Sequence, residues 1–173
     1  MPKNTVEQQR EVGLKEELLQ REALYREALA VQLDWLRTLP VQEITPKLLS
    51  QLQTALSDTF YLTKLSKNPR FFTETDEQKN NCRLLLLEIL ECMADDFPAC
   101  AIMFAEYYVL TMTGETLTMK QIGKRYNLTG SRVSQRVQAA ERKIRARYIY
   151  DTNFADRVHR VVVWDENVNN ITE

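Results

Sequence analysis

The stretch TLTMKQIGKRYNLTGSRVSQRVQAAERKIRARY, residues 116–148, differs in charge and in apolar spacing from the rest of the 173-residue chain. Between residues 118 and 150, nine Lys and Arg residues stand against one acidic residue, Glu141, which gives a net charge of +8. The whole chain has a net charge of −1, so the remaining residues sum to −9. A basic block on an otherwise acidic chain indicates a polyanionic partner, although a solvated helix face has the same composition.

The apolar residues of this stretch predict a short helix, a tight turn and a longer helix. Thr118 and Gln121 match a capping box that would start the first helix, expected over residues 119–126. Gly123 lies where a Cβ would obstruct a closely crossing second helix. The second helix carries a single apolar stripe, formed by Val133, Val137, Ala140 and Ile144. This pattern predicts a helix-turn-helix, whose second helix enters the DNA major groove with its N-terminal part.

Polar and basic side chains are expected on the outer face of the motif. Gln135 is the strongest candidate for reading a base, because a side-chain amide can bond adenine N6 and N7. The basic residues would contact phosphates, which supply affinity and register but no sequence choice. The candidate DNA-binding residues are Lys124, Arg125, Thr129, Gly130, Ser131, Arg132, Ser134, Gln135, Arg136, Gln138, Arg142 and Lys143.

The remainder of the chain predicts an all-α fold, because helix-favouring residues dominate and only four Gly and five Pro interrupt them. Helices are expected over residues 5–37 and from residue 46 to about 66, as an N-terminal helical hairpin. A third helix would open at TETDEQ, and its run LLLLEIL, residues 84–90, indicates a buried segment. A fourth would end at Gly114. In the tail, the β-branched RVHRVVVW favours a short strand over a final helical turn.

These elements suggest three parts. Residues 1–68 would be a helical hairpin for protein contacts, and residues 69–150 a four-helix domain that contains the helix-turn-helix. Residues 151–173 would be a short tail. The sequence SKNPRFF, residues 66–72, is the expected linker.

The sequence shows no pattern typical of catalysis, metal binding or cofactor binding. Its three Cys and single His lack metal-ligand spacing, and no phosphate-binding loop is present, so we expect no enzyme, no metal and no cofactor. An odd number of Cys without a signal peptide suggests reduced thiols in the cytoplasm. No apolar run approaches the roughly 20 residues of a membrane span, so no membrane partner is expected.

The motif also resembles a known family. TGETLTMKQIGKRYNLTGSRVSQRVQAAERKIR, residues 113–145, resembles the fourth conserved region of the bacterial sigma-70-type sigma factors. The resemblance rests on the Ile-Gly of the first helix, the Arg-apolar-x-Gln segment and the closing Arg-Lys-apolar-Arg. The preceding residues 84–114 resemble the paired helices before this motif in the family, so the resemblance covers about residues 84–148.

This resemblance implies a sigma-like or accessory transcription factor that binds double-stranded DNA and the flap of RNA polymerase. Gln135 and Arg132 match DNA-contacting positions of the family, and Arg142, Lys143 and Arg145 match the basic end of its long helix. Gly130-Ser131 replaces the usual Arg-Glu pair, which removes a bidentate guanine contact. Two alternatives keep the fold: an RNA polymerase interaction module without DNA binding, as coactivator or inhibitor, and a repressor-type homodimer joined through the N-terminal helices.

Overall fold

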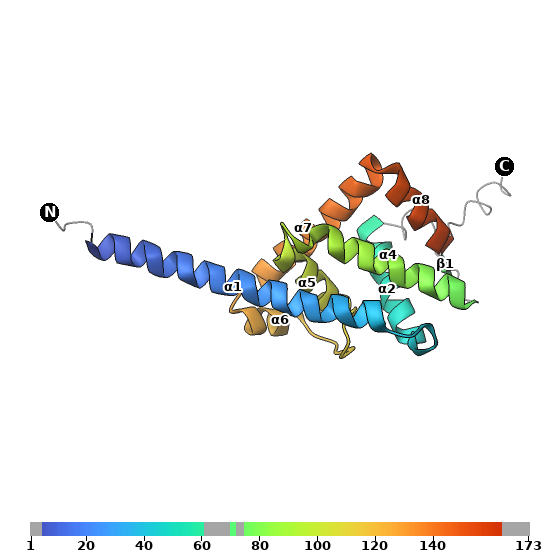
Figure 1. The fold of residues 1–173 in the computed structure, drawn as a ribbon, viewed down its shortest axis with the longest axis horizontal. Helices are drawn as coiled ribbons and strands as arrows, with labels where there is room; N and C mark the ends of the chain where they lie inside the picture. Colours follow the sequence, from blue (N-terminus) through green and yellow to red (C-terminus); the bar gives the residue numbers. More distant parts are fainter. Residues whose placement is uncertain (1–4, 61–69, 72–74, 164–173) are drawn as a thin grey trace.

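The helices assemble around a central helix, α5, in a computed structural model that describes residues 5–60, 70–71 and 75–163 (Figure 1). The predicted all-α fold with a helix-turn-helix is confirmed. The helices are α1 (Thr5–Thr38), α2 (Pro46–Phe60), α4 (Asp76–Ala94), α5 (Pro98–Tyr107), α6 (Met119–Tyr126), α7 (Gly130–Tyr150) and α8 (Thr152–Val161). The short elements are the 3₁₀ turn η2 (Val41–Glu43) and the strands β1 (Arg70–Phe71) and β2 (Val162–Val163).

Helix α5 is apolar on all sides, which explains its central position. Its buried residues include Ile102, Met103 and Phe104, which are consecutive in sequence and point in different directions around the helix. A helix of this kind is stable only when other elements surround it. The neighbours of α5 are α1, α4, α6 and α7, so the helix-turn-helix is built directly onto the centre of the core.

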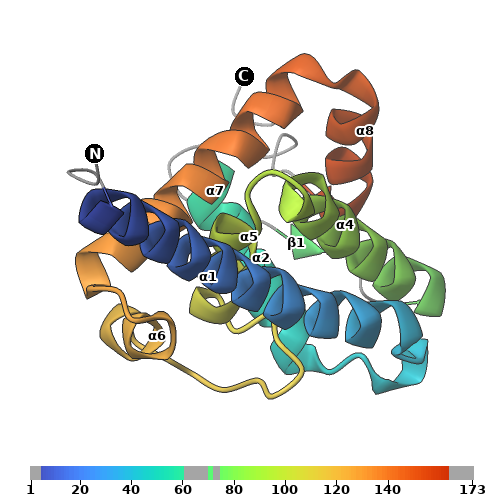
Figure 2. The same ribbon diagram turned by 60° about the vertical axis from the view of Figure 1, so that its left-hand side comes forward.

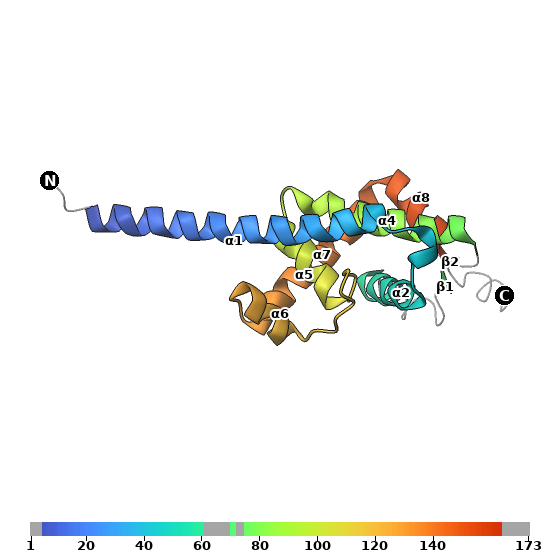
Figure 3. The same ribbon diagram turned by 60° about the horizontal axis from the view of Figure 1, so that its bottom comes forward.

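Helix α1 has two different halves. Its C-terminal half packs on α4 and α5 through Tyr25, Leu29, Leu33 and Leu36, which are all buried. Residues 5–20 are exposed along their whole length. Figures 1 and 3 show this first half of α1 projecting beyond the end of the body formed by α6 and the start of α7. We call residues 5–20 the arm.

The first two helices of the chain contact different parts of the structure. The main neighbours of α1 are α4 and α5, whereas α2 lies against α7, as the separated α1 and α2 in Figure 3 also show. One hydrophobic core includes Leu29 of α1, Leu56 of α2, Leu86 of α4 and Val137 of α7. The core therefore crosses the expected domain boundary at residue 68. That boundary remains a prediction, and the expected linker lies largely outside the described residues.

The tail begins as a helix rather than as the expected strand. Phe154, Val158 and Val161 of α8 lie on one side of the helix and are buried against α4 and α7. Asp151 starts this helix by accepting a hydrogen bond from Phe154 N through its Oδ1, at 3.1 Å. The strand is limited to β2, which pairs antiparallel with β1. The β-branched composition favoured a strand, but the buried stripe at helical spacing decided the outcome.

A half-buried carboxylate attaches α8 to the rest of the helices. Glu88 of α4 accepts hydrogen bonds from Arg147 of α7, at 2.9 Å, and from Arg157 of α8. Contact with Glu88 raises the pKa of Arg157 above its usual value. None of the described helices is both long enough and apolar enough to cross a membrane.

Candidate nucleic-acid interface

Helix α6 begins and ends at residues whose backbone conformation is determined by the sequence. Thr118 Oγ1 accepts a hydrogen bond from Gln121 N at 3.1 Å, and Gln121 Oε1 accepts one from Thr118 N at 2.8 Å. This is the expected capping box. The helix ends at Asn127, which has a left-handed φ of 56°, a conformation that Asn tolerates better than most residues. The first helix thus has the predicted bounds, residues 119–126.

The turn between α6 and α7 brings the two backbones into close contact at Gly123. A Cβ on Gly123 would lie 2.4 Å from Leu128 O, a backbone atom that cannot move aside alone. Leu128 N also donates a hydrogen bond to Gly123 O at 2.8 Å. Glycine is therefore required here for steric reasons, as the sequence suggested.

Helix α7 starts at Thr129 and turns its predicted apolar stripe inward. Thr129 Oγ1 accepts a hydrogen bond from Arg132 N at 3.2 Å. The four stripe residues are at most 1% exposed: Val133, Val137, Ala140 and Ile144. Because these residues hold one side of α7 against the core, the opposite side of its first turns faces solvent.

The outward side of α7 presents most of the candidate residues. The exposed ones are Ser131, Arg132, Gln135, Gln138 and Arg142. Gly130 and Ser134 are half-buried, and Gly130 lies against the backbone of Lys120. Both residues were expected to face outward and are partly covered instead. Gln135 lies near the centre of the outer face, at the position expected for a base contact.

The cations of the basic block divide into two groups. One group is exposed and makes no ion pair with another described residue: Lys120, Lys124, Arg132, Arg136 and Arg142. Lys120 was counted in the basic block but not among the candidates, although its place in the first turn of α6 could have identified it. Lys120, Lys124, Arg132 and Arg136 lie around the start of α7, where a phosphate backbone would pass, and Arg142 lies further along the helix.

The second group of cations is engaged in intramolecular contacts. Arg145 donates to Thr59 O at 3.0 Å, and Arg147 pairs with Glu88. Lys143 lies 3.4 Å above the ring of Phe97, in a cation–π contact. These three cations, in the C-terminal half of α7, therefore attach this helix to α2, α4 and the start of α5.

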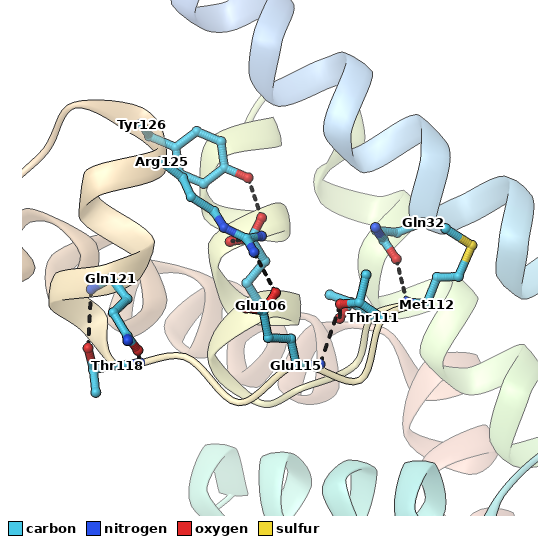
Figure 4. A network of polar contacts seen from close by, with 10 residues as sticks. Gln32, Glu106, Thr111, Met112, Glu115, Thr118, Gln121, Arg125 and Tyr126 are labelled. Atoms are coloured by element: carbon cyan, nitrogen blue, oxygen red, sulfur yellow. Dashed lines mark hydrogen bonds and ion pairs between the residues drawn. The ribbon is translucent and has the colours of Figure 1, made fainter.

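Arg125 belongs to a polar network that joins α5, α6 and the loop between them (Figure 4). Its guanidinium lies 2.7 Å from Glu115 Oε2 and 3.8 Å from Glu106 Oε2. Glu106 is buried and accepts a hydrogen bond from Tyr126 Oη. Burial raises the pKa of Glu106, and the Tyr126 hydrogen bond partly opposes that rise. Arg125, a candidate phosphate contact, is thus held by two carboxylates in this structure.

Helix α1 lies beside the helix-turn-helix, which local sequence patterns did not predict. The rings of Tyr25 and Tyr126 are 5.2 Å apart between centroids. In the loop before α6, Met112 N donates to Gln32 Oε1 at 2.8 Å (Figure 4). A groove of about 390 Å³ between α1, the α4–α5 turn and the motif is lined by Leu18, Arg21, Glu22, Tyr25, Asp96, Phe97, Pro98, Ala99, Cys100, Leu128 and Arg136. Arg136 thus points towards α1, on the flank of the recognition face.

The described residues contain no group of three or more His, Cys, Asp or Glu side chains that could hold a metal ion. The arrangement instead offers a rigid helix with a polar, cationic outer face at its N-terminal end. Such a face can bind a phosphate backbone and place Gln135 against base edges.

Comparison with known proteins agrees with this geometry. Residues 104–146 match the family described as Sigma-70, region 4, which spans the end of α5 through most of α7. Searches of curated proteins and of solved structures found no significant match. The match lies within the resemblance inferred for residues 84–148 and covers α6, the turn and α7 as far as residue 146. Residues 104–146 are therefore similar to sigma-70 region 4, and they fold as a helix-turn-helix of that kind.

Proposed function

We propose that this protein is a sigma-like or accessory transcription factor that binds double-stranded DNA through α6 and α7 and also contacts RNA polymerase. The observation that supports this proposal most is the outer face of α7. It carries Gln135 between Arg132 and Arg142, on a helix whose opposite side is fixed in the core. In this proposal Gln135 contacts a base, and Lys120 and Lys124 of α6 contact phosphates.

Two substitutions test DNA reading on this face. Gln135→Ala should cost roughly 1–3 kcal/mol on a selected site and little on scrambled DNA, because it removes a base contact. Lys124→Ala should weaken binding to both DNAs about equally, because a phosphate contact carries no sequence information. The measurement is a competition titration of each variant on the two DNAs.

The salt dependence of the same titration measures the phosphate contacts. Five exposed cations lie on α6 and α7, so log K should fall with log salt with a slope of roughly −4 to −5. A flat salt titration would contradict phosphate-driven binding. If Gln135→Ala weakened both DNAs as Lys124→Ala does, α7 would be an electrostatic surface without base reading.

The alternative is an RNA polymerase interaction module that has lost DNA binding. Gly130 and Ser131 favour this alternative. Glycine has no side chain and that of serine is short, so neither residue can make the bidentate base contact expected at the start of a recognition helix. In both versions the helix-turn-helix fold is the same, and only the partner of α7 differs.

A polymerase pull-down with Arg132→Glu separates the two versions. We expect the variant to lose DNA binding, because a cation on the outer face becomes an anion, and to retain polymerase capture. Arg142→Glu is the matched comparison nearly three turns further along the exposed side of α7. If the unmodified protein captured polymerase without binding any DNA, the interaction module would be the correct function.

A further inference from the structure

The arm, residues 5–20 of α1, is exposed along its whole length and borders the groove beside the helix-turn-helix through Leu18 near its end. Its large apolar side chains are 54–66% exposed: Val6, Val12, Leu14, Leu18 and Leu19. A helix of this length is marginally stable in water by itself, and exposed apolar side chains gathered on one element indicate an interaction site. Figures 1 and 3 show the ribbon of the arm extending beyond the body.

One side of the arm is in line with the side of α1 that packs against the body further along the helix. Leu14 precedes Tyr25 by eleven residues, and Leu18 precedes Leu29 by the same distance. Eleven residues make just over three helical turns, so each pair lies on the same side of the helix. Tyr25 and Leu29 are buried, whereas Leu14 and Leu18 are exposed. A partner that covers Leu14 and Leu18 would extend a packing surface that already exists.

We propose that a second copy of this chain covers the arm, with the two arms antiparallel and the centre of the pair between Gly13 and Leu14. In this register Leu14 meets Leu14 of the second copy across the two-fold axis. Arg10 and Glu17 lie equally far from the centre, on the same flank of Leu14, so each Arg10 meets the opposite Glu17. Two-fold interfaces require this kind of self-complementarity.

The other charges of the arm fit the same register. Lys15 and Glu11 lie on the second flank and meet at the same height within one residue. Arg21 likewise meets Glu7 of the other copy. Each basic residue between positions 5 and 21 thus faces a carboxylate, and the symmetry makes each pair twice. DNA fits the arm less well, because its four Glu and two basic residues give it a net charge of −2.

In this pairing the N-terminal end of each arm lies at the groove beside the helix-turn-helix of the other copy. At this register the start of one arm lies beside residues 21 and 22 of the other. Arg21 and Glu22 line the groove, together with Phe97 and Leu128. The N-terminal turn of the arm would therefore contact a mixed apolar and charged surface, in addition to the other arm.

If the proposed DNA binding is correct, the pair also specifies the geometry of the DNA site. Tyr25 contacts Tyr126, so each helix-turn-helix lies at the height of Tyr25 along α1. The two Tyr25 residues would be separated by about 23 residues of helix, or roughly 34 Å. This equals the spacing of half-sites one DNA turn apart. The two-fold axis relates the two helix-turn-helix motifs in opposite orientations, so the site would contain two inverted half-sites.

Light scattering of the full chain over a range of concentrations tests the pair, since one chain has a mass of 20.3 kDa. We expect a particle of twice that mass. Arg10→Glu alone and Glu17→Arg alone should each raise the dissociation constant by about tenfold or more, because two attractive pairs become repulsive. The double variant Arg10→Glu/Glu17→Arg should restore the dimer.

The rescue separates contacts between chains from contacts within one chain. Glu17 also pairs with Arg21 of its own helix, at 3.0 Å, and the double variant leaves that intrachain contact broken. Glu16→Arg is the control, because it makes the same charge change on the opposite side of the helix and should leave the dimer intact. The mass of a single chain at every concentration would overturn the proposal. It would also be overturned if the single variants Arg10→Glu and Glu17→Arg dimerised as the unmodified protein does, or if the double variant stayed dissociated.

DNA titration of the same variants distinguishes this inference from the proposed function. A dimer that binds no DNA would refute the proposed function and leave the arm pairing established. Tight DNA binding by a monomer, with no gain from a second half-site, would refute the arm pairing and leave the DNA-binding function intact.

Discussion

Gly123→Ala is expected to lower the free energy of unfolding by about 3 kcal/mol, the upper end of the range for overpacked sites. The added Cβ would lie 2.4 Å from Leu128 O, so the turn between α6 and α7 would have to move. This turn is held between Asn127, whose conformation ends α6, and Thr129, which caps the start of α7. Thermal unfolding followed by circular dichroism should show a midpoint lower by about 6–12 °C.

Gly13→Ala is the matched control for this substitution. Nothing in the same chain lies within 4 Å of a Cβ built on Gly13, so alanine creates no clash within the chain. Alanine favours a helix interior over glycine by roughly 1 kcal/mol, so this variant should gain helical signal without losing stability. DNA binding by Gly123→Ala should also fall, because α7 would shift relative to α6. An unchanged midpoint for Gly123→Ala would contradict the close contact at this turn.

A fragment of residues 69–150 is expected to melt without a cooperative transition. The sequence suggests that this part folds alone, but the fragment lacks the buried Tyr25, Leu29, Leu33 and Leu36 of α1. Removing one buried leucine side chain typically costs about 2–5 kcal/mol, and a whole domain has only about 5–15 kcal/mol of stability. The loss of this stripe alone is comparable with the total. Circular dichroism and calorimetry of the fragment provide the measurement.

Residues 21–163 are the matched comparison for the fragment. This version lacks the arm but retains each core residue of α1, α2 and α8, so we expect one cooperative transition close to that of the full chain. Equal, cooperative melting of the fragment 69–150 would show that the boundary at residue 68 separates independent domains. It would also show that α1 packs on a domain that is already stable.

The helix-turn-helix was predictable because its determinants are local. Thr118, Gln121 and Thr129 cap helices through bonds to residues three positions away, and Gly123 meets Leu128 five positions away. The inward stripe of α7 follows from the helical repeat. The family match to residues 104–146 covers this same segment.

The roles of the individual cations could not be predicted, because charge patterns do not show which partners the fold brings near. Arg125 meets Glu106 and Glu115, and Arg147 meets Glu88, 59 positions away in sequence. Sequence counting assigned these arginines to one basic block. The structure leaves the cations near the start of α7 exposed and uses those near its end to hold helices together.

The sequence by itself determined the all-α class, the bounds of α6 and the inward side of α7, since each depends on neighbours within a few residues. Only the tertiary structure decided that α1 packs on α5 beside the motif, that α2 packs on α7, and that the tail folds back as α8. These contacts join residues tens of positions apart, and an apolar stripe shows that a helix has a buried side without showing which element covers it. The arm is an example, because Leu14 and Leu18 have the same spacing as Tyr25 and Leu29, yet only Tyr25 and Leu29 are buried. The spacing alone does not show which of these residues another element covers.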